Sequence, residues 1–193
     1  GPSEEVTPVV LDIVRDLHVK ATFFVVGYCV EKYPDLLRRI QDEGHGIGNQ
    51  TYSHRIKDIY QNRDTLMWDI YTCDKVIASV TGLHPKIFRP PGGSRPYLRP
   101  VLAAEVEKAG FFYYDWNVCP GDATNKKLPA EQLVNITLRQ AHNKNRIVIL
   151  LHDSKAMQQT TLALPRIIDN LTASGFSFSV IDEETSPVHF GQK

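Results

Sequence analysis

"ATFFVVG", residues 21–27, is the stretch from which the fold class follows. It is a short apolar run that is rich in β-forming residues and ends in glycine, which indicates a buried strand. Apolar residues at helical spacing precede it, and the amphipathic stretch "PDLLRRIQDEG" (34–44), with a glycine stop, follows it. A strand between two helices is typical of a parallel α/β sheet.

The same alternation continues to the end of the chain. Short links between strands and helices predict a parallel sheet covered by helices, in one domain over residues 1–193. The chain opens on a helix, so we expect a further strand before it that is not in this sequence. The other strands are predicted at 45–49, 86–89, 111–116, 146–152 and 176–182, and the helices at 64–82, 99–109, 129–142 and 160–174.

Composition excludes some classes of function. The chain has 22 Lys and Arg residues and 22 Asp and Glu residues, so its net charge is zero. This balance argues against a nucleic-acid partner that is held by bulk charge. No apolar run approaches the roughly 20 residues that a membrane-spanning helix needs. The sequence therefore predicts a globular domain with no membrane span.

Polar residues gather where the predicted strands end. In parallel α/β folds, functional sites lie at the carboxyl ends of the strands, so these residues are candidates for a common site. A charged side chain at the end of a core strand costs free energy, so its presence there indicates a function. The candidates are Gln50, His54, Arg89, Asp115, Trp116, Asp122, His152 and Asp153.

Most of these residues also have a purely structural interpretation. His54 alone could be a hydrogen-bonding loop residue, and Arg89 could belong to a structural ion pair. Asp115 and Asp122 could cap the segments that follow them. His152 is harder to explain structurally, because it closes a strand of Ile, Val and Leu residues. The pattern therefore favours a functional role for His152.

Four short motifs stand in order along the chain, and together they resemble a known family. With "GPSEEVTPVVLDIV" (1–14) and "KATFFVVG" (20–27), they make the whole chain similar to the polysaccharide deacetylases. That family is also called the NodB-homology domain or carbohydrate esterase family four, and it includes peptidoglycan and chitin deacetylases. The motifs are "QTYSH" (50–54), "RPPGG" (89–93), "CPGDA" (119–123) and "ILLHD" (149–153).

The resemblance implies both a fold and a reaction. The fold would be a distorted (β/α) barrel of about seven strands, with the first strand missing from this chain. The reaction would be hydrolysis of N-acetyl groups on an amino-sugar polysaccharide such as peptidoglycan or chitin. A divalent metal, zinc above all, would activate water, and the partner would be an N-acetylated glycan. Peptidoglycan as substrate would place the protein outside the cell or facing the cell wall.

The resemblance also assigns roles to individual residues. His54 would be a metal ligand, and Arg89 would orient the catalytic base. His152 would be the general acid, and a carboxylate near it would tune its proton affinity. The fourth motif offers Cys119 or Asp122 at that position, so Asp122 is the carboxylate available. Residues of the oxyanion site and the substrate groove would be Pro91, Gly92, Gly93, Asp115 and Trp116.

The chain departs from the family pattern at the metal site. Gln50 stands where the family has its first metal-binding histidine, and an amide oxygen is a weaker zinc ligand than imidazole. The two aspartates of the first family motif would precede Gly1, so we expect the chain as given to bind zinc weakly. Two alternatives follow, which are a catalytically dead glycan-binding pseudoenzyme and a deacylase that acts on a different amide or ester.

Overall fold

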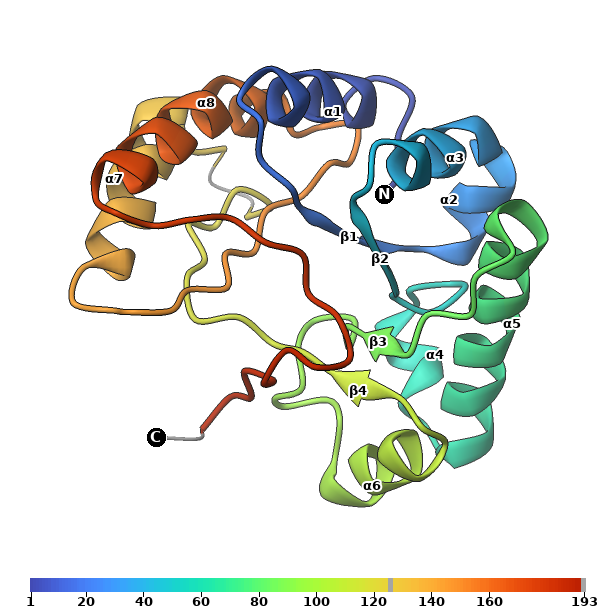
Figure 1. The fold of residues 1–193 in the computed structure, drawn as a ribbon. Coiled ribbons are helices and arrows are strands. Elements are labelled where there is room, and N and C mark those ends of the chain that lie inside the picture. The colour runs from blue at the N-terminus through green and yellow to red at the C-terminus, as the bar shows by residue number, and fades with distance from the viewer. Residues whose placement is uncertain (125–126, 192–193) are drawn as a thin grey trace. The chain divides into compact units, whose positions relative to one another are not determined.

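Helices and strands alternate along the chain as the sequence predicts (Figure 1). The structure, a computed structural model, describes residues 1–124 and 127–191. Within these residues one sheet has four strands in chain order, and every pairing is parallel, which confirms the α/β class. The strands are β1 (Thr22–Val25), β2 (Gly46–Asn49), β3 (Ile87–Phe88) and β4 (Phe112–Tyr113).

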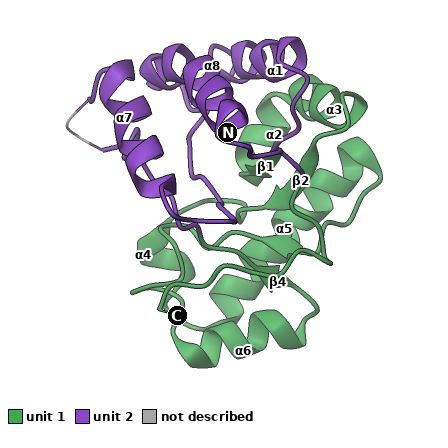
Figure 2. Ribbon diagram, turned by 60° about the vertical axis from the view of Figure 1, so that its left-hand side comes forward, with its two compact units in different colours: residues 1–2, 22–115, 180–193 green, residues 3–21, 116–179 purple. Residues whose placement is uncertain are grey.

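The chain divides into two compact units (Figure 2). Unit 1 consists of residues 1–2, 22–115 and 180–193, and unit 2 of residues 3–21 and 116–179. Among the helices of the described residues, none combines the length and apolar character that crossing a membrane requires. Unit 1 contains α2 (Gly27–Lys32), α3 (Pro34–Asp42), α4 (Ile56–Ile59), α5 (Arg63–Thr81) and α6 (Pro100–Lys108), and unit 2 contains α1 (Thr7–Asp16), α7 (Ala130–Ala141) and α8 (Gln158–Ala173).

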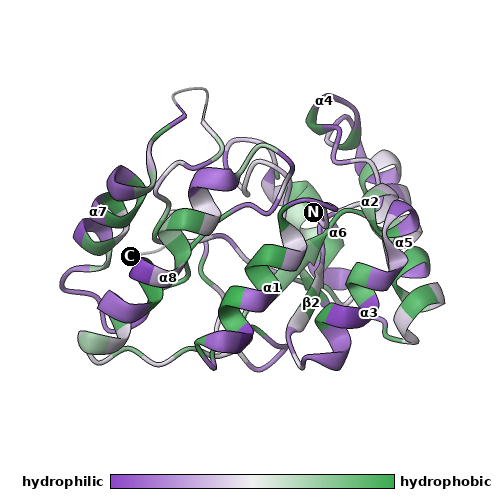
Figure 3. Ribbon diagram, turned by 90° about the horizontal axis from the view of Figure 1, so that it is seen from above, coloured by the Kyte–Doolittle hydropathy of each residue, from purple (hydrophilic) through white to green (hydrophobic). Residues whose placement is uncertain are grey.

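Helix α5 shows how local sequence sets the elements of unit 1. Asn62 accepts a hydrogen bond from the backbone N–H of Thr65, and the Thr65 hydroxyl accepts one from the Asn62 N–H, so a capping box begins the helix. Gly82 ends it at φ 73°, a left-handed conformation that glycine adopts at little cost. Apolar and polar residues alternate along this and other helices (Figure 3), and the buried apolar face of α5 contains Leu66, Met67, Ile70, Cys73 and Ile77.

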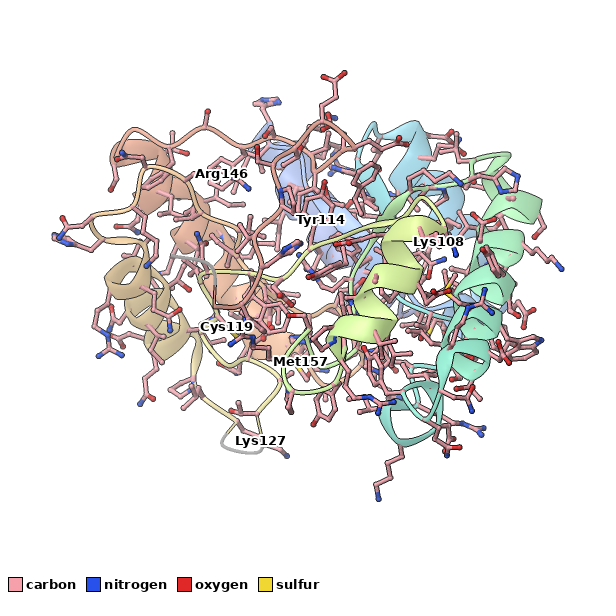
Figure 4. All side chains as sticks on the ribbon, turned by 90° about the horizontal axis from the view of Figure 1, so that it is seen from below. Lys108, Tyr114, Cys119, Lys127, Arg146 and Met157 are labelled. Atoms are coloured by element: carbon pink, nitrogen blue, oxygen red, sulfur yellow. The ribbon has the colours of Figure 1, made fainter. Side chains whose placement is uncertain are left out.

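The predicted strand over 176–182 is not a strand in the structure. Ile181 donates its N–H to the Thr22 hydroxyl rather than to a backbone carbonyl, so no ladder forms there. The segment from residue 180 is instead held by Tyr114, which is fully buried and labelled in Figure 4. The Tyr114 hydroxyl lies 2.9 Å from the carbonyl oxygen of Asp182 and 2.8 Å from that of Thr185.

The predicted strand over 146–152, which lies in unit 2, is reduced to a single parallel bridge between Val118 and Ile149. Leu150 donates to the Val118 carbonyl, and Val118 donates to the carbonyl of Val148. Pairing stops there because Cys119 donates to a side chain and Pro120 has no N–H. Within residues 1–124 and 127–191 the sheet has four strands, and this open sheet does not contradict the distorted barrel that the resemblance implies.

Gly48 in β2 leaves the space that Phe24 of β1 occupies. A Cβ atom at residue 48 would lie 2.4 Å from a ring carbon of Phe24 and 3.1 Å from Ile87. We predict that Gly48→Ala lowers the free energy of unfolding by about 1–3 kcal/mol through overpacking. Urea denaturation measures this loss. In a Phe24→Leu background the loss should shrink, and purely additive effects of the two substitutions would contradict the explanation.

Candidate functional site

The loop after β2 holds the candidate ligands Gln50 and His54 in unit 1. Asn49, fully buried, donates its side-chain N–H to the Ile70 carbonyl and accepts from the N–H of Thr51. The Thr51 hydroxyl in turn accepts from the N–H of His54 at 3.1 Å. Thr51 and His54 have φ values of 65° and 56°, a left-handed region that residues with a side chain seldom adopt. The loop therefore keeps a costly shape because buried hydrogen bonds specify it.

Asp69 stabilises this loop through hydrogen bonds. It is a buried carboxylate on α5, and its Oδ2 atom accepts from both the backbone N–H and the hydroxyl of Ser53. Its carbonyl oxygen also accepts the N–H of Tyr52. Neither Asp69 nor Asn49 was predicted as a site residue from the sequence. Asp69 could have been predicted, because it lies next to the apolar face of a predicted helix, where a charged side chain is costly.

The described residues do not make a complete zinc site on their own. Among residues 1–124 and 127–191, no group of three or more His, Cys, Asp or Glu side chains is placed to hold a metal ion. A catalytic zinc usually has three protein ligands. In the loop after β2, which we call the metal loop, the chain supplies the imidazole of His54 and the amide of Gln50. This donor set is too small and, at Gln50, too weak for tight zinc binding.

Arg89 lies buried at the end of β3. Its guanidinium carbon is 4.1 Å from the centre of the Phe24 ring, and its Nε atom donates to the Tyr114 carbonyl at 3.4 Å. Burial lowers the pKa of Arg89 to about 10, and the negative charge of Asp115 opposes this shift. The side chain is therefore still a cation at neutral pH. A buried cation can orient a carboxylate, which is the role that the resemblance assigns to it.

The loop after Arg89 exposes one glycine. Pro91 and Gly93 are buried, whereas Gly92 is exposed. Gly92 and Gly93 have φ values of 78° and 85°, and Gly93 donates to the Pro90 carbonyl in a tight turn. Of the three loop residues assigned to the oxyanion site and groove, Gly92 is thus the one open to a ligand.

The carboxylate of Asp115 accepts its hydrogen bonds from other groups of the protein. Its carboxylate is fully buried in unit 1 and accepts from the Ser94 N–H at 2.7 Å, the Ser94 hydroxyl at 2.5 Å and the Phe190 N–H at 2.9 Å. A buried carboxylate with these partners anchors the segments that it joins, and its assignment to the groove stays a prediction. Trp116, also assigned to the groove, is half-buried in unit 2.

His152 and Asp122 form a hydrogen-bonded pair in unit 2. The Nδ1 atom of His152 lies 2.9 Å from Oδ1 of Asp122. Asp122 also accepts from the backbone N–H of His152 at 2.8 Å and from the Thr160 hydroxyl at 2.9 Å. The Asp122 side chain is 1% exposed and the His152 side chain is 37% exposed. Because a carboxylate only accepts, the hydrogen of this bond is on Nδ1 of His152.

The fourth motif offers two residues near the acid, and the structure pairs one of them with His152. Asp122 contacts His152, whereas Cys119 donates its N–H to Gln140 and has a thiol whose pKa burial raises. Thr160, the third partner of Asp122, was not predicted, because nothing in the helical pattern of residues 160–174 marks it. Unit 1 holds Gln50, His54, Arg89, Pro91, Gly92, Gly93 and Asp115, and unit 2 holds Trp116, Asp122 and His152. That all of them form one cluster stays a prediction.

Comparison with known proteins gives a consistent result. A family model described as polysaccharide deacetylase matches residues 1–114. The chain is 33% identical to a Bacillus cereus protein named peptidoglycan-N-acetylglucosamine deacetylase, over 98% of the chain and 70% of that protein. It is 31% identical to a chitooligosaccharide deacetylase of Azorhizobium caulinodans, over 92% of the chain and 87% of that protein. The crystal structure of the Bacillus cereus polysaccharide deacetylase Bc1974 is similar with a TM-score of 0.91 and 33% identity, over 98% of this chain and 92% of that one.

We predict that Asp115→Ala destabilises unit 1 by more than about 2 kcal/mol, since it removes the acceptor of three hydrogen bonds from Ser94 and Phe190. Urea denaturation measures the loss, and faster amide exchange at both residues locates it. Asp58→Ala is the control, because Asp58 is exposed and forms a long ion pair of 3.9 Å with Arg55. It should change stability by less than about 0.5 kcal/mol. Equal effects of the two substitutions would refute the anchoring role.

Proposed function

Because the chain belongs to the polysaccharide deacetylase family, we propose that it removes N-acetyl groups from an amino-sugar polysaccharide of the peptidoglycan or chitin type. The family's members are hydrolases that act on amide bonds. The observation that carries the proposal for this chain is the pair of His152 with a buried carboxylate at the positions of the family's last two motifs. Relatives named for peptidoglycan and for chito-oligosaccharides support the substrate class.

His152 serves as the general acid in this proposal. Amide hydrolysis expels an amine, which leaves readily only when it is protonated. Asp122 holds the hydrogen of Nδ1, so Nε2 is the atom that transfers a proton to the leaving amine. The hydrogen bonds from Thr160 and from the His152 backbone keep the carboxylate in place. Asp122 thus positions the imidazole.

Gly92 and Arg89 serve the other end of the reaction. The carbonyl oxygen of the acetyl group becomes negative as water adds, and a fixed N–H donor lowers the energy of that state. The exposed backbone of Gly92 offers such a donor. Arg89 is suited to orient the catalytic base of the family, because its guanidinium is buried against the ring of Phe24.

The proposal includes metal dependence as a property of the family's deacetylases, and it assigns no step to a metal in this chain. Deacetylases of this family are generally metal-dependent. The ligands that this chain offers in its metal loop are His54 and Gln50, and they fall short of a zinc site. The roles given above are therefore those of the protein's own residues.

Gln50 favours a second candidate function. A chain that keeps the loop and the acid but lacks a metal-binding histidine could bind an N-acetylated glycan without cleaving it. Both candidates share the same partner, and both place the protein outside the cell or facing the cell wall. Acetate release from chito-oligosaccharides and peptidoglycan fragments separates them. Release supports the deacetylase, and binding without release supports the pseudoenzyme.

We predict that His152→Ala lowers turnover by about 10²–10⁴-fold, as removal of a general acid does. Acetate release under saturating substrate measures the loss, and thermal denaturation should show an unchanged fold. Gln158→Ala is the control, because Gln158 is exposed and its side-chain amide donates to the nearby Lys155 carbonyl. Loss of folding in place of turnover would return His152 to a structural role.

We predict that Gln50→His raises zinc affinity by about tenfold or more, because imidazole is the better ligand. Elemental analysis after equilibrium dialysis against zinc measures the bound metal. Gln50→Ala is the matched control and should bind zinc no more tightly than the parent. If the parent chain already holds stoichiometric zinc, Gln50 is a working ligand or the metal lies elsewhere.

A further inference from the structure

Tyr97 lies beside the exposed glycine of unit 1, and neither the family motifs nor the predicted site includes it. A Cβ atom built on Gly92 would lie 2.8 Å from Cε2 and 3.0 Å from Cδ2 of the Tyr97 ring. The ring therefore borders the backbone at residue 92 directly. Tyr97 is 39% exposed, so much of it is open to solvent.

The ring of Tyr97 is held in a fixed orientation. It stacks on the ring of Tyr60 with a centroid distance of 5.8 Å and an interplanar angle of 13°. The Tyr60 hydroxyl donates to the Pro91 carbonyl at 3.0 Å, which ties the stack to the same loop. Burial raises the pKa of Tyr60, so this hydroxyl keeps its hydrogen and remains a donor. Tyr60 thus stacks on one face of the Tyr97 ring, and Tyr97 remains partly open to solvent.

A single exposed aromatic residue needs no functional explanation. Three observations distinguish Tyr97 from such a residue, which are its stacked partner, the anchoring of that partner, and its contact with an exposed glycine in a motif loop. A rigid aromatic face beside a backbone N–H matches an acetylated amino sugar. The apolar C–H face of the sugar can stack on the ring while the acetamido group reaches the backbone.

We propose that Tyr97 is a stacking platform for a pyranose ring of the substrate, and that it positions the acetamido group at Gly92. This inference rests on the proposed function, because it takes an N-acetylated glycan as the ligand. Tyr97 does not touch the reacting bond, so it is a positioning residue. It should govern affinity for the glycan and have little effect on the chemical step.

The test compares binding of penta-N-acetylchitopentaose by the parent chain and by Tyr97→Phe, Tyr97→Leu and Tyr97→Ala, using calorimetry. Phe keeps the flat ring, whereas Leu keeps apolar cover over Tyr60 without a flat face. We expect Tyr97→Leu and Tyr97→Ala to raise the Kd by about fivefold to tenfold, the size of an aromatic contact, and Tyr97→Phe to stay near the parent. Where acetate is released, KM should rise by the same factor while kcat is unchanged.

Tyr71→Ala is the matched control, since Tyr71 is 45% exposed on α5 and packs against Phe111. It should bind as the parent does. Thermal denaturation of each variant shows whether the fold is retained. Binding by the parent with an unchanged Kd for Tyr97→Leu would overturn the platform and leave the proposed function standing. A parent that neither binds nor deacetylates this glycan or a peptidoglycan fragment would overturn both.

Discussion

The buried carboxylate of Asp115 connects more of unit 1 than any other polar group described above. It accepts three hydrogen bonds, two from Ser94 in the segment after Arg89 and one from Phe190 in the segment after residue 180. Its charge also favours the protonated form of the buried Arg89. A buried charge is tolerated only when such partners compensate for lost hydration, so the loop, the final segment and the arginine depend on one another.

The same device recurs in the two other parts of the candidate site. Asp69 accepts from the backbone and hydroxyl of Ser53, and Asp122 accepts from the backbone and ring of His152. Each aspartate is nearly inaccessible to solvent and fixes a loop that follows a strand or an extended segment. His54 and His152 themselves remain partly exposed. Rigid buried acceptors beneath accessible groups are what a preorganised site requires.

Sequence patterns predicted the fold class and the positions of most helices, because apolar spacing reports directly on burial. They overpredicted strands. "RIVILLHD" has the composition of a strand, yet its pairing depends on a neighbour that stops at Pro120, which local composition does not reveal. The predicted strand over 176–182 failed for a similar reason, since Ile181 bonds to a threonine side chain.

Within the candidate site, the sequence located the residues but not their partners. The motifs placed Gln50, His54, Arg89 and His152, and they left the choice between Cys119 and Asp122 open. The resemblance assigned Asp115 to the groove, and its burial could not be predicted from its place in the predicted strand over 111–116. Thr160 and Tyr97 were missed since their importance comes from contacts between segments distant in the chain.

The left-handed backbone at Thr51 and His54 gives the metal loop a shape that does not depend on which side chains could bind a metal. Such conformations cost on the order of 1 kcal/mol each, and here residues that bind no metal maintain them, namely Asn49, Ser53 and Asp69. The identity of the side chain at position 50 can therefore drift without collapse of the loop. An exchange between glutamine and histidine at this position would therefore change the zinc affinity of the loop without requiring a new backbone shape.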